Sequence, residues 1–234
     1  MSQGLGRLVE IAGVAGAGKS TLVRLISQAD PSIKVADFIH ARNPEHLVYE
    51  LHSAPRLLPI LIRGLVLRPR LNWPDVKLLV YVTEWSRFLT RKYEYRHALT
   101  LLDQGPMYAL VRLMAKGSRV SASPVFERWW NQMIADWSRR LDAIVWLDAA
   151  DDVLWERIND RAQPHAAKSG SAVDGQHFIT RYRELFDEVF RRIEAEGKPT
   201  VIRIDTSKKG SGEVAGEVRR LLDTDSRASG SIPW

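Results

Sequence analysis

The chain has 234 residues, of which 45% are hydrophobic, and its 34 Lys and Arg against 28 Asp and Glu give a formal net charge of +6. This length fits one α/β domain, and the absence of cysteine excludes disulfides, thiolate zinc sites and a thiol nucleophile. The positive charge favours an anionic ligand such as a nucleotide or phosphorylated metabolite, and it does not require nucleic acid. We expect a cytoplasmic protein, because the N-terminus has no signal-peptide pattern. We expect no membrane span, because the most apolar stretch, residues 57–67, is short and contains Arg63.

The most informative stretch is a glycine-rich loop between a predicted strand and a predicted helix. Residues 8–12 form an apolar run, and residues 21–26 have a helical pattern. Between them the sequence matches G-x-x-x-x-G-K-[ST], the phosphate loop of nucleotide-binding proteins. The glycines let successive backbone N–H groups point at one anion, Lys19 would reach the β- and γ-phosphates, and Ser20 would bind Mg²⁺. The predicted nucleotide-binding residues are Gly13, Val14, Ala15, Gly16, Ala17, Gly18, Lys19, Ser20 and Thr21.

Two more apolar runs are predicted to be strands that end at an acidic residue. One covers residues 32–38 and contains Asp37, and the other covers residues 98–102 and is followed by Asp103. A carboxylate at a strand end beside a phosphate loop is typical of a Mg²⁺ ligand or a general base. We assign Asp103 to Mg²⁺ or its water shell. Both acids remain candidates for the base, and Asp37 is the better one.

Residues 40–72 are rich in Arg and His, interleaved with Leu/Ile pairs and four prolines. The prolines predict one or two short helices. Two interpretations of the basic residues remain open: a solvated face of an irregular helical insertion, or a site for an anionic acceptor.

The rest of the chain continues to alternate between helices and strands. Helices are predicted for residues 74–98, 107–116, 124–141, 151–161, 177–196 and 211–222, and strands for residues 142–148 and 200–205. The aromatic stripe of the 124–141 helix, which includes Trp130 and Trp137, is predicted to be core rather than a base-stacking platform. Arg157 and Arg161 share one helical face, just before a small, polar, glycine-containing segment that has the composition of a lid. These arginines are either lid residues over the phosphates or surface residues in salt bridges.

Alternating strands and helices predict a parallel sheet covered on both faces, an α/β P-loop NTPase three-layer sandwich with a lid. We predict a single domain at residues 1–222, with an acceptor-side helical region at 38–72 and the lid at 157–177. Residues 223–234 are predicted to be a disordered tail. Ligands of such folds bind beyond the carboxyl ends of the strands, so the phosphate loop and the strand-end acids should converge there.

With these segments in that order, the chain resembles the thymidylate kinase and deoxynucleoside kinase family of P-loop kinases. The phosphate loop carries the resemblance, together with Leu102-Asp103-Gln104-Gly105-Pro106, the stretch from residue 144 to Arg161, and Ile204-Asp205-Thr206. The resemblance implies ATP and Mg²⁺ as the phosphoryl-donor system, a lid arginine over the phosphates, and an adenine-side loop near residues 205–207. Two departures matter: these kinases usually have arginine after the strand-end acid, where this chain has Gln104, and the phosphate loop itself has no arginine. Arg157 and Arg161 are therefore the candidates for neutralising transition-state charge.

The leading hypothesis is an ATP-dependent small-molecule kinase. It would move the γ-phosphoryl group to a nucleotide, a nucleoside, or another small anionic or hydroxylated acceptor. The alternative is a P-loop ATPase with a regulatory or nucleic-acid-associated role. Whether the chain forms a homodimer stays open.

Overall fold

The computed structural model describes residues 6–36, 55–62, 72–92, 99–115, 122–160 and 172–228. Its five strands form one parallel sheet in the order β2-β3-β1-β4-β5, so the strand that leads into the phosphate loop is central. The strands are β1 (Arg7–Gly13), β2 (Lys34–Ala36), β3 (Leu99–Asp103), β4 (Ala143–Asp148) and β5 (Thr200–Asp205).

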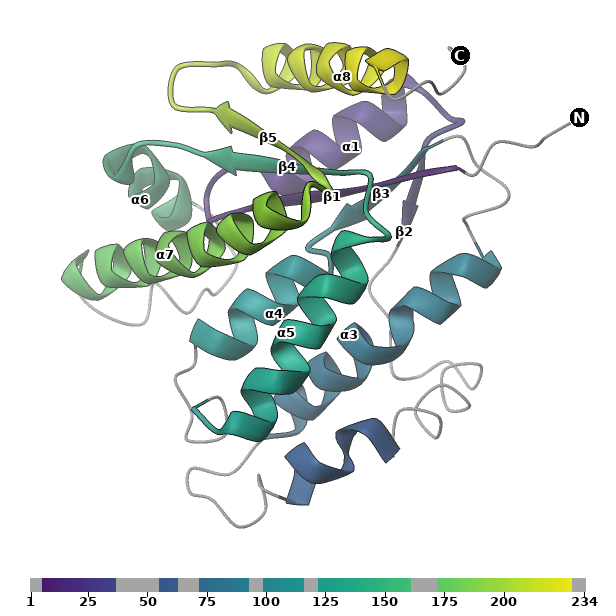
Figure 1. Ribbon diagram of the computed structural model, residues 1–234. Coiled ribbons are helices and arrows are strands. Elements are labelled where there is room, and N and C mark those ends of the chain that lie inside the picture. The colour runs from purple at the N-terminus through teal and green to yellow at the C-terminus, as the bar shows by residue number, and fades with distance from the viewer. Residues whose placement is uncertain are drawn as a thin grey trace, which may run out of the picture.

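Helices cover both faces of this sheet, as the alternating pattern predicts (Figure 1). On one side lie α1 (Lys19–Ala29) and α8 (Ser211–Ala228), and on the other lie α3 (Trp73–Lys92), α4 (Pro106–Ala115), α5 (Pro124–Ser138) and α7 (Ala172–Glu196). α6 (Asp151–Asn159) follows the carboxyl end of β4, and residues 55–62 form a further short helix. The molecule is therefore a three-layer α/β sandwich.

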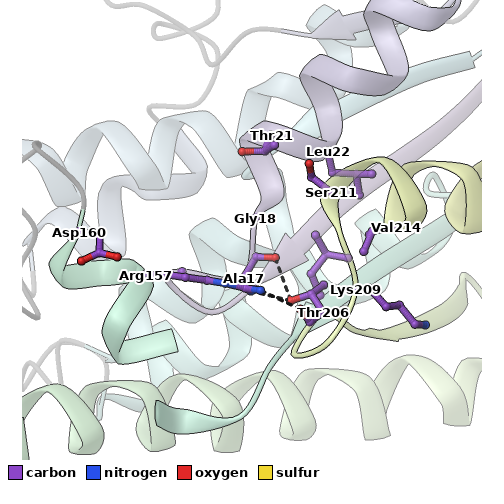
Figure 2. Close-up of a pocket in the computed structure, with 12 residues that line it drawn as sticks. Ala17, Gly18, Thr21, Leu22, Arg157, Asp160, Thr206, Lys209, Ser211 and Val214 are labelled. Carbon is purple, nitrogen blue, oxygen red and sulfur yellow. Dashed lines mark hydrogen bonds between the residues drawn. The ribbon is translucent and has the colours of Figure 1, made fainter. Parts of the chain in front are cut away.

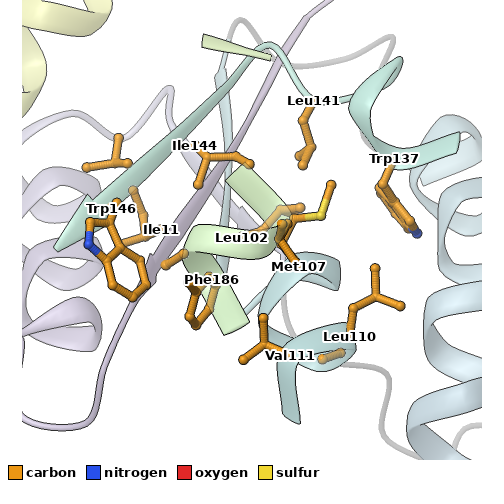
Figure 3. Packing of buried hydrophobic residues seen from close by; sticks show 14 of the residues in the cluster. Ile11, Leu102, Met107, Leu110, Val111, Trp137, Leu141, Ile144, Trp146 and Phe186 are labelled. Carbon is orange, nitrogen blue, oxygen red and sulfur yellow. The ribbon is translucent and has the colours of Figure 1, made fainter. Parts of the chain in front are cut away.

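The sheet is apolar because both of its faces are covered. The larger part of the core fills the space between the sheet and α4, α5 and α7, where Trp146 of β4 lies 4.4 Å from the ring of Phe186 of α7 (Figure 3). Leu102 and Ile144, on the two strands that flank β1, contribute to the same layer.

The aromatic stripe of α5 is core, as predicted. Ser123 caps the helix by accepting a hydrogen bond from the backbone of Phe126 at 3.3 Å, and Pro124 occupies the first turn. The buried indoles donate their N–H groups within the protein: Trp130 to the carbonyl of Leu110 and Trp137 to the carbonyl of Val82. Buried and hydrogen-bonded inside the helical layer, these rings are not available to stack on a ligand.

Two predicted boundaries need correction. The lid was predicted to extend to residue 177, but α7 already begins at Ala172, and Gly175 packs against the ring of Trp155, where a Cβ would lie only 1.9 Å from the ring. The tail was predicted to be disordered from residue 223, but α8 continues to Ala228, because the first glycine or proline after Leu222 is Gly230. Within the part of the chain that the structure describes, no helix has the length and apolar character needed to span a bilayer.

Candidate active site

The phosphate loop joins β1 to α1 at the carboxyl edge of the sheet. Gly16 has a φ of +86°, which strains any residue with a Cβ, and a Cβ there would lie 2.8 Å from the carbonyl oxygen of Leu154 in α6. A Cβ on Gly13 would lie 2.4 Å from the carbonyl oxygen of Leu147 in β4. No side chain caps the N-terminus of α1. Its first backbone N–H groups, with the positive end of the helix dipole, therefore form an anion site.

Lys19 is the first residue of α1, is largely buried, and reaches back into this loop. Its ammonium donates to the carbonyl oxygens of Gly13 at 2.9 Å and Val14 at 2.8 Å. It also lies 5.8 Å from the centre of the Tyr108 ring of α4. The lysine is thus held at the anion site by the loop and faces an aromatic ring that sequence reasoning did not select.

Asp103 ends β3 next to the phosphate-loop strand, where it pairs in register with Ile11. Its Oδ1 atom is buried and accepts no hydrogen bond from the residues that the structure describes. The turn that follows is unusual, because Gln104 has a positive φ of 57°, a conformation that costs a residue with a Cβ energy. A buried carboxylate oxygen without a partner is costly, so this atom is a candidate ligand for a cation or a donor group.

A second carboxylate, which sequence reasoning missed, packs against this turn. Glu10 of β1 is fully buried and accepts hydrogen bonds from the backbone N–H groups of Met107 at 3.0 Å and Tyr108 at 2.9 Å. Although Glu10 lies on β1, it therefore caps the N-terminus of α4, the helix that follows β3. A Cβ on Gly105 would lie 2.7 Å from the Glu10 carboxyl carbon, so the turn can approach only because residue 105 is glycine. Burial raises the pKa of Glu10 from 4.5 to about 7, although the two backbone hydrogen bonds oppose this shift.

A cavity of about 380 Å³ extends from the phosphate loop toward β5 and α8 (Figure 2). Its wall combines glycines, apolar side chains and a few polar groups, as small-molecule sites commonly do. The lining residues are Gly16, Ala17, Gly18, Thr21, Leu22, Leu147, Arg157, Asp160, Thr206, Lys209, Ser211 and Val214. Two segments that the sequence analysis selected separately, the phosphate loop and the loop after β5, thus line one cavity.

Arg157 extends from α6 across this cavity to Thr206 (Figure 2). Its Nη1 donates to the Thr206 hydroxyl at 3.0 Å and its Nη2 to the Thr206 carbonyl at 2.8 Å. The same hydroxyl donates to the carbonyl of Asp148 at 3.0 Å. In this conformation Arg157 is fixed in the wall of the cavity, and a direct role in phosphoryl transfer would require the contact with Thr206 to open. That role stays a prediction.

The strand ends that carry these residues are tied to α7. Arg183 donates its Nε to Asp148 at 2.8 Å and its Nη2 to the carbonyl of Ala149 at 2.7 Å, and its Nη1 pairs with Asp151. Asp148, which ends β4, is therefore held in an ion pair with Arg183. Its bidentate contact with a guanidinium positions the start of α6.

The structure places Arg157 in one cavity with the phosphate loop, and places Asp103 at the end of the strand beside β1. Asp37 and Arg161 lie outside the described residues. Glu10, Tyr108 and Arg183 were missed. Glu10 had one signal, a charged residue inside an otherwise apolar strand.

Comparison with solved structures supports this fold. No protein-family model matches the chain, and no curated protein matches its sequence. Among solved structures, thymidylate kinase from Candida albicans superimposes with a TM-score of 0.60 and 15% identity, covering 95% of this chain and 93% of that one. Deoxyadenosine kinase from M. mycoides with bound dATP gives a TM-score of 0.56 and 14% identity, covering 92% and 99%. The same enzyme with the products dCMP and dCDP gives 0.56 and 13%, covering 93% and 99%. Because these matches extend over nearly the whole of both chains, the protein has the α/β P-loop fold of the thymidylate and deoxynucleoside kinases.

Proposed function

We propose that the protein is an ATP-dependent phosphotransferase, a small-molecule kinase that transfers the γ-phosphoryl group of ATP to a nucleotide, a nucleoside or another small acceptor. The observation that carries the proposal is the single cavity shared by the phosphate loop and the loop after β5. A volume of about 380 Å³ is at the lower end of the usual range for small-molecule sites. The anion site of α1 opens on one side of it. Such a cavity suits a nucleotide whose base lies near Thr206 and whose phosphates lie along residues 13–20.

Each residue of the donor site then has a role that follows from its position. Lys19 would move its ammonium from the loop carbonyls to the β- and γ-phosphates, where it offsets the charge that develops during transfer. Arg157 and Thr206 would form the part of the cavity wall that lies beside the base and the ribose. Arg161, just beyond the end of α6, remains the candidate for a lid arginine over the phosphates.

The residues at this edge of the sheet fit a magnesium ion. Ser20 is exposed in the first turn of α1, and Asp103 presents a buried oxygen with no hydrogen bond from the described residues. Within those residues no cluster of three or more His, Cys, Asp or Glu could hold a metal by itself. An ion here would be bound by one hydroxyl, one carboxylate and the nucleotide phosphates, the usual arrangement for Mg²⁺. When bound, the ion would neutralise phosphate charge.

The decisive experiment is isothermal titration with ATP and Mg²⁺, followed by measurement of ADP formation with pooled nucleosides, nucleotides and sugars. We expect ATP to bind and Lys19→Ala to abolish transfer. The exposed Lys34→Ala variant is the matched control and should behave as the parent. No ATP binding by the parent protein would contradict the proposal. Rapid ATP hydrolysis with no acceptor consumed would favour the ATPase alternative.

A further inference from the structure

A partly buried arginine lies on α4, the helix that begins beside the phosphate loop. Arg112 lies in the last turn of α4 and is partly buried. It makes no hydrogen bond and no ion pair with the residues that the structure describes. Asp103 is in the same situation.

These two uncommitted charges flank one aromatic side chain. Burial raises the pKa of the Tyr108 hydroxyl, the guanidinium of Arg112 opposes that shift, and the carboxylate of Asp103 adds to it. Both charges therefore lie close enough to act on the same phenol. Lys19, 5.8 Å from the ring centre, is a third charge beside it.

Geometry explains why Arg112 faces the same region as Tyr108. The two residues are four positions apart on α4 and so lie on one face of the helix, and long helical side chains lean toward the N-terminus. The N-terminus of α4 is the end that Glu10 holds against the strand of the phosphate loop. From the opposite side α7 adds Tyr182, whose ring lies 6.4 Å from that of Tyr108. Burial also raises the pKa of the Tyr182 hydroxyl, while Arg112 opposes the shift. Two protonated phenols and a guanidinium thus lie together, and one of the phenols, Tyr108, also faces Lys19.

A guanidinium taken partly out of water is costly unless an anion meets it. Its planar array of donors matches the oxygens of a phosphate, and phenolic hydroxyls can donate to the same oxygens.

We propose that Arg112, with Tyr108 and Tyr182, binds an anionic group of the acceptor, and that the acceptor is a phosphomonoester. The assignment rests on the proposed kinase function and narrows it: the acceptor phosphate lies beyond the γ-phosphate, on the α4 side of Lys19. An oxygen of that phosphate attacks the γ-phosphorus. The bond from this phosphorus to the β,γ-bridging oxygen breaks, and ADP leaves with the electron pair. The acceptor oxygen is already ionised at neutral pH, so no base has to remove a proton.

The first test uses adenosine 5′-pentaphosphate, which extends the ATP chain by two phosphates and carries no second nucleoside. We expect it to bind at least tenfold more tightly than ATP, both with Mg²⁺, in isothermal titration. Arg112→Gln should remove this gain, a loss of about 10- to 100-fold for a charge-assisted contact, and should leave ATP affinity unchanged. The control is Arg128→Gln, an exposed arginine of α5. Thermal unfolding of Arg112→Gln should match that of the parent, because the side chain has no partner among the described residues to lose.

The second test compares turnover of nucleoside and hexose monophosphates with turnover of the corresponding nucleosides and hexoses. We expect turnover of the phosphorylated member of a pair, and a KM for it that rises in Arg112→Gln while the KM for ATP does not. The proposal is overturned if adenosine 5′-pentaphosphate binds no better than ATP, or if Arg112→Gln binds it as the parent does. Turnover of only the unphosphorylated acceptors would also overturn it and leave the kinase function standing. Failure of the kinase function itself would appear separately, as absence of ATP binding.

Discussion

The buried carboxyl group of Glu10 makes a quantitative prediction about stability and pH. The residue is fully buried in β1, two backbone N–H groups of α4 donate to it, and its pKa rises from 4.5 to about 7. Glu10→Gln keeps the size of the side chain and removes its ionisation. The difference in the free energy of unfolding between the parent and this variant should therefore depend on pH.

The sign and the size follow from the shift. Because the folded-state pKa is raised, the folded protein holds the proton more tightly than the unfolded chain. The contribution to stability is complete below pH 4.5 and is lost as pH rises to about 7. A shift of about 2.5 pH units corresponds to about 3 kcal/mol, the loss expected across this window. Tyr81, the neighbouring phenol, stays protonated throughout, because burial, Glu10 and Asp103 raise its pKa.

The assay is urea denaturation of both proteins at several pH values from 4.5 to 8. A constant offset of about 1–3 kcal/mol is expected, because the glutamine amide places an N–H group against one of the two backbone donors. The informative quantity is how the difference in the free energy of unfolding between the two proteins changes with pH. Relative to the variant, the parent should become less stable as pH rises. Glu127→Gln, in the exposed first turn of α5, is the matched control and should show no such trend. A difference that stays constant within about 0.5 kcal/mol from pH 4.5 to 8 would refute the reasoning.

Three further outcomes are expected. Asp103→Asn should lower kcat at least 10²-fold with every acceptor, if its buried oxygen serves Mg²⁺; an active Asn variant would remove Asp103 from the site. Arg157→Ala should raise the Kd for ATP by about tenfold, because the residue forms the cavity wall with Thr206. A fall in kcat at saturating ATP with unchanged Kd would instead support a transition-state role. Gly105→Ala should reduce the free energy of unfolding by about 1–3 kcal/mol, because its Cβ meets the Glu10 carboxyl group. Its control is Gly216→Ala in α8, where a Cβ meets nothing within 4 Å and which should not destabilise the protein.

Local patterns in the sequence were enough to predict the strands, most helices and the phosphate loop. Their physical basis is short-range: a glycine-rich turn between an apolar strand and a helix has few alternative conformations. The alternation of such elements implies a parallel sheet. The position of Asp103 at the carboxyl edge follows from that alternation, because every parallel strand ends at the same edge. The extension of α8 to Ala228 was missed because charged and polar residues without a helix breaker resemble both a tail and a helix end.

Only the tertiary structure decided what the buried and paired charges do. Glu10 and Gly105 are 95 residues apart, and nothing in either local sequence shows that one caps the helix that follows the other. Arg183 and Arg112 are both helical arginines, and neither local sequence shows which of them has a carboxylate partner in the fold. Packing of α7 places the first against Asp148 and Asp151, whereas packing of α4 leaves the second facing Tyr108 and Tyr182 with no carboxylate partner among the described residues. The sequence therefore determines the fold and the phosphate-loop motif, whereas long-range packing determines which charges are paired within the described part of the protein and which are not.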